Sequence, residues 1–275
     1  MLPFFVVVGV FFFLPAGVLF FDAFRITDPD TQVTRFGLDN LEQASKGGYR
    51  TAFMGSIKLS VVTAVLGAVL GLLLAQAVVT ARRGNLLRRL VLTASGVLAN
   101  FGGVPLAFAF IATIGNAGVI TALLKDAFGY DLGSSLYSFS GLALVYLYFL
   151  VPLMVLVIVP ALDGLRPQWH EAAENLGATR WQYWRHVGGP ILAPPVVGAT
   201  MLLFCSAFAA FATAAAMVGS TVPLVTLQIS DVLSGNVLAG QENVGKALGL
   251  GMVAVIAVVM TVYVLVQRRT SRWFR

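Results

Sequence analysis

The sequence offers few side chains whose type and spacing could do covalent chemistry. The segment from Gly240 to Lys246 has the glycine and lysine spacing of a phosphate-binding loop, but Ala247 follows where a hydroxyl should hold magnesium. His170 and His186 lie sixteen residues apart, with no cysteine or acid at ligand spacing around both. We therefore expect no catalytic residue and no metal site, and we do not expect this chain to be an enzyme.

Composition indicates that lipid surrounds most of the chain. The 275 residues are 58% hydrophobic and 11% charged, with a mean hydropathy of +0.87. Soluble domains carry about 25% charged residues, so this chain lacks the ionic surface that water requires. The single cysteine, Cys205, excludes a disulfide framework and a four-cysteine metal site within the chain.

Long runs without charge predict six membrane-spanning helices in a single domain, 1–275. A spanning helix needs about 20 apolar residues, because the hydrocarbon core is about 30 Å thick. The runs are too continuous for the alternation of a barrel. The first run lacks the basic region of a signal peptide, so we expect it to be retained. We predict an all-α membrane protein with spans near 3–21, 54–80, 90–114, 139–162, 195–218 and 247–267.

The distribution of basic residues predicts which side faces the cytoplasm. The segments after the second, fourth and sixth spans hold eleven arginines and three acids, for a net charge of +8, whereas the opposite side has a net charge of −2. Basic residues accumulate on the cytoplasmic side of membrane proteins. Both termini are therefore expected in the cytoplasm, and the 22–53 loop is expected outside.

The longest predicted cytoplasmic segment, 163–194, carries signals for two short helices. Pro167 suits the first turn of a helix, and Gly177 can take the left-handed conformation that ends one. Thr179 and Gln182 form a capping box that starts the second helix. A helical pair lying on the membrane surface is one interpretation of this segment. Prolines are expected to redirect the chain into the fifth span, at Pro190, Pro194 and Pro195.

The same segment resembles the EAA loop of ABC importer permeases, whose pattern is Glu-Ala-Ala-x3-Gly-x9-Ile-x-Leu-Pro. The matching residues are Glu171, Ala172, Ala173, Gly177 and Pro190. Val187 stands at the isoleucine position. Gly189 stands where the family usually has leucine, and this difference puts the anchoring of the second helix in doubt. The resemblance covers the chain from about residue 50 to its end. It implies the transmembrane domain of a type I ABC importer in the bacterial inner membrane.

The resemblance also implies partners and residue roles. A second permease subunit would complete the pathway, an extracytoplasmic substrate-binding protein would deliver substrate, and a cytoplasmic ABC ATPase dimer would use ATP and magnesium. This chain itself would bind no cofactor and no nucleic acid. Glu171 would make an ionic contact with the ATPase, and Gly177 would allow the turn between the helices. The docking residues implied for this coupling loop are Glu171, Ala172, Ala173, Gly177, Thr179, Arg180 and Pro190.

Neutral polar residues are the candidates for a translocation path. Ionisable residues inside a membrane usually mark such paths, and none lies near the middle of a predicted span; Lys58 lies at an edge. Hydrogen bonds within a helix, or helix–helix contacts, are an equally strong interpretation of each candidate. The candidates are Asn100, Tyr146, Tyr148, Ser206 and Thr213.

Substrate identity is weakly encoded, because the binding protein carries most of the selectivity in importers of this family. The stretch 100–110 is similar to permeases of the polyamine, iron and sulfate-type branch. A polyamine is the favoured expectation, and an inorganic ion or a sugar is the alternative. A secondary transporter or channel working without ATP would show inverted repeats or a buried charge relay, and we find neither in the sequence.

Overall fold

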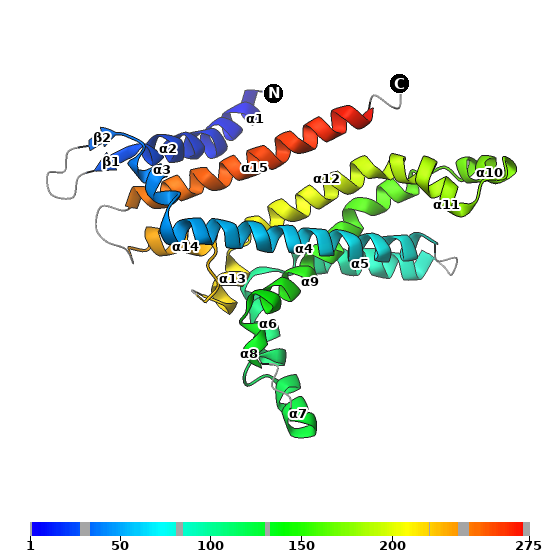
Figure 1. Ribbon diagram of the computed structural model, residues 1–275, viewed down its shortest axis with the longest axis horizontal. Coiled ribbons are helices and arrows are strands. Elements are labelled where there is room, and N and C mark those ends of the chain that lie inside the picture. Colours follow the sequence, from blue (N-terminus) through cyan, green and yellow to red (C-terminus); the bar gives the residue numbers. More distant parts are fainter. Residues whose placement is uncertain are drawn as a thin grey trace. The chain divides into compact units, whose positions relative to one another are not determined.

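The computed structural model describes residues 2–27, 34–80, 85–129, 133–219, 221–235 and 242–271 (Figure 1). The chain divides into two compact units, which we describe separately. The first unit comprises Met1–Ile57 and Gly219–Val258, and the second comprises Lys58–Val218 and Val259–Arg275.

The first unit begins with the N-terminal span. Helices α1 (Leu2–Val8) and α2 (Leu14–Ala23) are joined without a break by η1 (Gly9–Phe13), a wider π-helical turn. Two short antiparallel strands follow, β1 (Arg25–Thr27) and β2 (Thr34–Phe36), and form a β-hairpin that the expectation of an all-helical chain did not include. Helix α3 (Asp39–Ala44) comes next.

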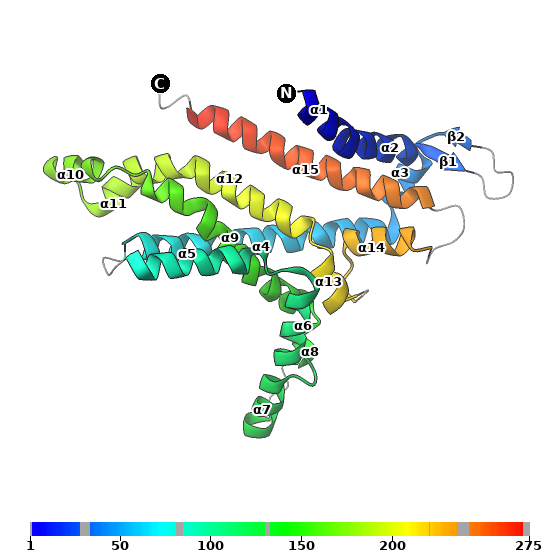
Figure 2. The same ribbon diagram turned by 180° about the vertical axis from the view of Figure 1, so that it is seen from behind.

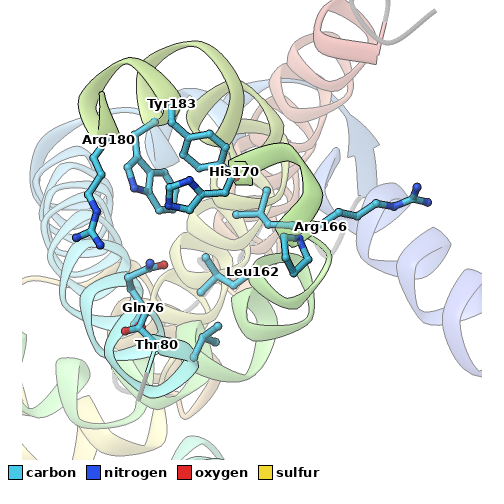
Figure 3. Close-up of a pocket in the computed structure, with 11 residues that line it drawn as sticks. Gln76, Thr80, Leu162, Arg166, His170, Arg180 and Tyr183 are labelled. Atoms are coloured by element: carbon cyan, nitrogen blue, oxygen red, sulfur yellow. The ribbon is translucent and has the colours of Figure 1, made fainter. Parts of the chain in front are cut away.

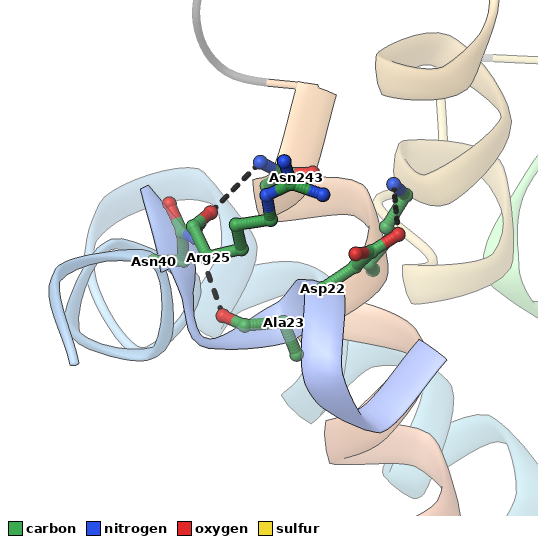
Figure 4. A network of polar contacts seen from close by, with 6 residues as sticks. Asp22, Ala23, Arg25, Asn40 and Asn243 are labelled. Atoms are coloured by element: carbon green, nitrogen blue, oxygen red, sulfur yellow. Dashed lines mark hydrogen bonds and ion pairs between the residues drawn. The ribbon is translucent and has the colours of Figure 1, made fainter. Parts of the chain in front are cut away.

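Amide side chains tie this β-hairpin to its neighbours (Figure 4). Asn40, which is 5% exposed, donates from Nδ2 to the carbonyls of Ala23 (3.2 Å) and Arg25 (2.9 Å). Asn243, near the start of α15 (Glu242–Ser271), donates to the same Arg25 carbonyl at 2.7 Å. Lys246 Nζ pairs with Asp22 Oδ2 at 2.7 Å. The end of α2 is thus held by both α3 and α15.

Helix α4 (Gly47–Thr80) starts in the first unit and packs closely on the segment before α14 (Val225–Leu233). A Cβ on Gly55 would lie 2.3 Å from the carbonyl oxygen of Pro223, so only glycine permits this approach. At the next residue, Ser56 Oγ accepts a 2.9 Å hydrogen bond from the first backbone N–H of α14, at Val225.

The second unit is built around α9 (Phe139–Asp163), which packs against both α5 (Asn85–Asn100) and α12 (Gly189–Phe208) (Figure 2). Leu142, Leu150 and Met154 of α9 are fully buried. The remaining helical segments are the rest of α4 and then α6 (Gly103–Ile114), α7 (Val119–Phe128), α8 (Gly133–Leu136), α10 (Pro167–Asn175), α11 (Arg180–Tyr183), η2 (Trp184–Gly188) and α13 (Ala212–Met217).

Glycine sets the distance between α4 and α9. A Cβ on Gly71 would lie 2.4 Å from Met154 Cβ and 2.9 Å from the carbonyl oxygen of Val151. Small residues allow this close backbone approach between helices in lipid, where van der Waals packing rather than the hydrophobic effect drives association.

Six helical stretches among the described residues are long and apolar enough to cross a membrane, which confirms an all-α protein with six spans. The third stretch differs from the expected 90–114. The chain leaves helical geometry at Phe101 and Gly102, and Gly103 has a φ of +74°. The six are Pro3–Ala23, Gly47–Thr80, Gly103–Phe128, Phe139–Asp163, Arg180–Phe208 and Asn243–Arg268.

The fifth span also differs from the expected 195–218. Helix α12 begins at Gly189 and ends at Phe208, and α13 follows as a separate short helix. The prolines expected to redirect the chain lie inside helical backbone instead, with Pro190 at the first positions of α12 and Pro194 and Pro195 within it. Proline fits the first turn of a helix because the N–H groups there lack an intrahelical partner.

Candidate functional site

The loop between the fourth and fifth spans, 163–194, contains the two short helices that the sequence predicts. Helix α10 starts with Pro167 in its first turn and ends before Gly177, whose φ is +77°. The Gly177 N–H bonds to the Glu174 carbonyl, and the Ala178 N–H bonds to the Ala173 carbonyl, both at 2.9 Å. This pair of bonds is the Schellman motif that closes a helix on a left-handed glycine. The turn expected at Gly177 is confirmed.

A capping box starts α11, as expected. The Thr179 N–H donates to Gln182 Oε1 at 2.7 Å, and the Gln182 N–H donates to Thr179 Oγ1 at 3.3 Å. After α11 the chain passes through the π-helical turn η2 directly into α12. Pro190 of the implied docking set therefore lies exposed at the start of the fifth span.

The outer side of the loop exposes both charge and apolar surface. Glu171 is exposed, and its carboxylate makes no ion pair or hydrogen bond with any residue that the structure describes. Ala172 is exposed and Ala173 is half-buried. Leu176 is 87% exposed and Trp181 is 72% exposed. Large apolar side chains that protrude in this way are typical of a surface that another molecule covers.

The inner side of the loop encloses a pocket that sequence reasoning did not find (Figure 3). Tyr183 is 6% exposed, and its ring stacks on the His170 imidazole with 4.8 Å between ring centroids. Arg180, expected among the docking residues, lines this pocket. No local signal marks such a pocket, because residues from α4 and α9 supply the opposite wall.

An ion pair fixes the base of the loop. Asp163 is the last residue of α9, and its carboxylate pairs with the guanidinium of Arg88 on α5. A negative charge at a helix C-terminus is unfavourable by itself, and the arginine compensates for it. The sequence shows both residues but gives no indication that they meet, because they lie 75 positions apart.

Two of the residues predicted for the translocation path are buried and bind backbone groups. Tyr146 is 1% exposed, and its hydroxyl donates to the Ala210 carbonyl at 3.0 Å. Thr213 is 3% exposed, and its hydroxyl bonds to both the N–H and the carbonyl of Gly103. Both side chains therefore satisfy backbone at helix breaks, in agreement with the structural interpretation of these candidates.

The other path candidates are more accessible. Asn100 is exposed, and its amide donates to the Gly96 carbonyl at 2.8 Å, within its own helix. Tyr148 is half-buried against Phe110, edge to face at 5.7 Å. Ser206 is half-buried in α12. Their role as path lining stays a prediction.

Comparison with known proteins identifies the family. Residues 67–275 match the sequence profile of the family described as "Binding-protein-dependent transport system inner membrane component". The chain belongs to this family. It is thus a multi-pass protein of the bacterial inner membrane and a transport permease component rather than an ATPase, as the resemblance implied.

Relatives of this permease serve several transport systems. It is 26% identical over 137 residues to "Ferric transport system permease protein FbpB" of Actinobacillus pleuropneumoniae, covering 49% of this chain and 20% of that protein. It is 37% identical over 75 residues to "Sulfate transport system permease protein CysT" of Escherichia coli, 27% of either chain. It is 28% identical over 117 residues to "Spermidine/putrescine transport system permease protein PotB" of Haemophilus influenzae, 42% of this chain and 40% of that protein. The matched regions span two fifths or less of the length of these relatives.

Solved structures share the fold of the permease over nearly its whole length. A bacterial ABC transporter involved in the import of the acidic polysaccharide alginate has a chain with a TM-score of 0.76 and 17% identity, covering 98% of this chain and 93% of that one. A bacterial alginate ABC transporter in complex with alginate pentasaccharide-bound periplasmic protein has a chain with a TM-score of 0.74 and 18% identity, covering 98% of this chain and 92% of that one. The expected fold of an ABC importer permease is confirmed.

Proposed function

We propose that this chain is the transmembrane permease subunit of an ATP-driven, binding-protein-dependent importer. It forms half of the translocation pathway with a second permease subunit, identical or homologous, and receives substrate from an extracytoplasmic binding protein. Its 163–194 loop docks on a cytoplasmic ABC ATPase dimer. The observation that carries the proposal is the exposure of Glu171 and Ala172 on α10, beside half-buried Ala173, with a Glu171 carboxylate that has no partner among the described residues.

The connections of the loop favour a coupling role. Only Gly164, Leu165 and Arg166 separate α9 from α10, and η2 joins α11 to α12 without a break. Helices α9 and α12 also pack on each other. A force on the loop is therefore transmitted to two packed spans at once. Closure of the ATPase dimer would move these spans and switch the permease between two states.

Relatives of comparable identity serve ferric, sulfate and spermidine/putrescine systems, so similarity favours this branch rather than one substrate. A polyamine is the substrate that we propose to test first, with sulfate-type and ferric ions as competitors. Uptake of labelled spermidine that excess sulfate does not reduce would support a polyamine as the substrate. Uptake of sulfate and not of spermidine would assign sulfate as the substrate instead.

Charge reversal at Glu171 tests the docking role. An exposed ion pair contributes little free energy. Removing the partner of a charge enclosed in a protein cleft costs several times more. We expect Glu171→Lys to lower substrate-stimulated ATP hydrolysis and uptake on the order of thirtyfold or more, because the lysine would face a basic residue of the ATPase. Expression and thermal stability of the permease should be unchanged, since Glu171 is exposed and its side chain makes no hydrogen bond or ion pair with the described part of its own chain.

The matched control is Asp126→Lys, the same charge change at an exposed position on α7. It should keep uptake and co-purification with the ATPase at wild-type levels. Wild-type uptake by Glu171→Lys would contradict the docking role of this glutamate.

A further inference from the structure

A pocket of about 320 Å³ lies between the 163–194 loop and the ends of two spans, and Glu171 is not among its lining residues. Three segments that are distant in sequence contribute its walls: the last turn of α4, the junction between α9 and α10, and the pair α11–η2. The volume equals roughly ten water molecules at about 30 Å³ each, so it exceeds what a single bridging water needs.

Arg180 and Gln76, two of the polar residues that line this pocket, have side chains without a partner among the described residues. The Arg180 guanidinium makes no ion pair and no hydrogen bond with any residue that the structure describes, and neither does the side-chain amide of Gln76. Figure 3 shows both on the same side of the pocket, whereas the Arg166 side chain points away from it. Arg180 is exposed and Gln76 is half-buried, so both side chains are open to solvent and to a ligand that enters the pocket.

Charge in the pocket has one sign. Its lining residues include Arg166, which points away, Arg180 and no acid, although Glu174 Oε1 lies 3.6 Å from Nδ1 of the lining residue His170. Asp163, next to the wall residue Leu162, is already paired with Arg88. Arg180 does not cap the end of α4 either, because its guanidinium makes no hydrogen bond with the described residues of that helix. The guanidinium therefore remains available to a ligand.

Apart from Thr80 and His170, the rest of the lining is apolar or aromatic. Val79, Leu162, Leu165 and Pro167 form the aliphatic wall, and the rings of Tyr183 and Trp184 close the other side. Such a lining suits a molecule with an anionic group and an uncharged body. On the predicted orientation, the pocket lies at the cytoplasmic ends of the spans, at the depth of the lipid headgroups.

We propose that this pocket binds a phosphate group, carried by an anionic phospholipid headgroup or by free phosphate, through Arg180 and Gln76. The planar guanidinium fork matches the geometry of phosphate oxygens, and the Gln76 amide supplies a further donor. An occupant would touch α4, the end of α9 and α11 together, and would hold the loop against the spans. The proposal depends on the predicted orientation and not on docking to the ATPase.

The test uses the full-length permease alone, in bilayer discs of phosphatidylcholine with or without phosphatidylglycerol. The midpoint of thermal unfolding is measured in each, and inorganic phosphate is titrated separately into the phosphatidylcholine discs. The variants are Arg180→Gln and Gln76→Leu, and the control is Arg185→Gln, an exposed arginine of the same loop that does not line the pocket. We expect Arg180→Gln to weaken the response on the order of tenfold, and Gln76→Leu less.

If phosphatidylglycerol raises the unfolding midpoint of the wild type and of Arg185→Gln but not of Arg180→Gln, the occupant is a lipid headgroup. The same pattern with inorganic phosphate supports a free anion. Equal responses of the wild type and both pocket variants, or equal losses in Arg180→Gln and Arg185→Gln, would overturn the site. Since no ATPase is present, failure here leaves the outcome at Glu171 unaffected.

Discussion

Thr213 binds both backbone polar groups of Gly103. Its Oγ1 accepts from the Gly103 N–H at 2.9 Å and donates to the Gly103 carbonyl at 3.2 Å. Gly103 follows the break between α5 and α6, and Thr213 follows the break between α12 and α13. The Thr213 side chain thus satisfies the N–H that the start of α6 leaves free, in a region where lipid could not do so, and adds a second bond to the carbonyl.

Thr213→Val tests this contact with almost no change in volume. The variant leaves the half-buried Gly103 N–H without a partner and removes one of the two hydrogen bonds to the Gly103 carbonyl, so we expect a loss of about 1–3 kcal/mol in the free energy of unfolding. Thr200→Val is the control, because the Thr200 hydroxyl bonds only to the Val196 carbonyl of its own helix. Thermal unfolding in detergent should show a lower midpoint for Thr213→Val than for Thr200→Val. Equal midpoints would mean that the contact contributes nothing.

A methyl group at Gly71 should separate α4 from α9. The added Cβ would overlap Met154 Cβ at 2.4 Å, and overpacking of this kind costs about 1–3 kcal/mol. At Gly96 in α5 nothing lies within 4 Å of an added Cβ, and Gly→Ala inside a helix is favourable by about 0.5–1 kcal/mol. Gly71→Ala should therefore lower the unfolding midpoint while Gly96→Ala leaves it equal or raises it. A tolerated Gly71→Ala would show that the two helices can move apart.

The turn at Gly177 should depend on backbone conformation alone. Its φ is +77°, and no atom lies within 4 Å of an added Cβ. Valine there costs about 1–2 kcal/mol in the left-handed region, whereas asparagine tolerates that region. We expect Gly177→Val to insert in the membrane but to co-purify poorly with the ATPase, and Gly177→Asn to assemble nearly normally. If both variants assemble alike, the turn does not set the geometry of the docking surface.

Single-cysteine labelling tests the orientation. In a Cys205→Ser background, a cysteine at exposed Gln43 should react with an impermeant reagent in intact cells. A cysteine at exposed Asn175 on α10 should react only after the membrane is opened. Asn236, in the other predicted external loop, lies outside the described residues. Labelling of Asn175→Cys in intact cells would reverse the orientation and remove the loop from the ATPase side.

Local signals made the 163–194 loop predictable. The Thr179–Gln182 capping box and the left-handed Gly177 involve residues within one turn of each other, so the sequence alone indicates them. The spans follow from apolar length. The ends of α5 and α12 could not be located in this way, because the breaks are stabilised by Thr213 and Tyr146 across 110 and 64 positions. The β-hairpin and the pocket at Arg180 likewise depend on tertiary contacts.

The close approach of Gly71 to Met154 also has a consequence for biogenesis. Chains are synthesised at about 5–20 residues per second, and Met154 is made about 80 residues after Gly71. Helix α4 therefore enters the bilayer several seconds before α9 is made. Until then, the surface of α4 around Gly71 has no α9 to pack against. During that interval lipid or the insertion machinery must cover this surface of α4. The permease can acquire its α4–α9 contact only after its fourth span has followed the second into the membrane.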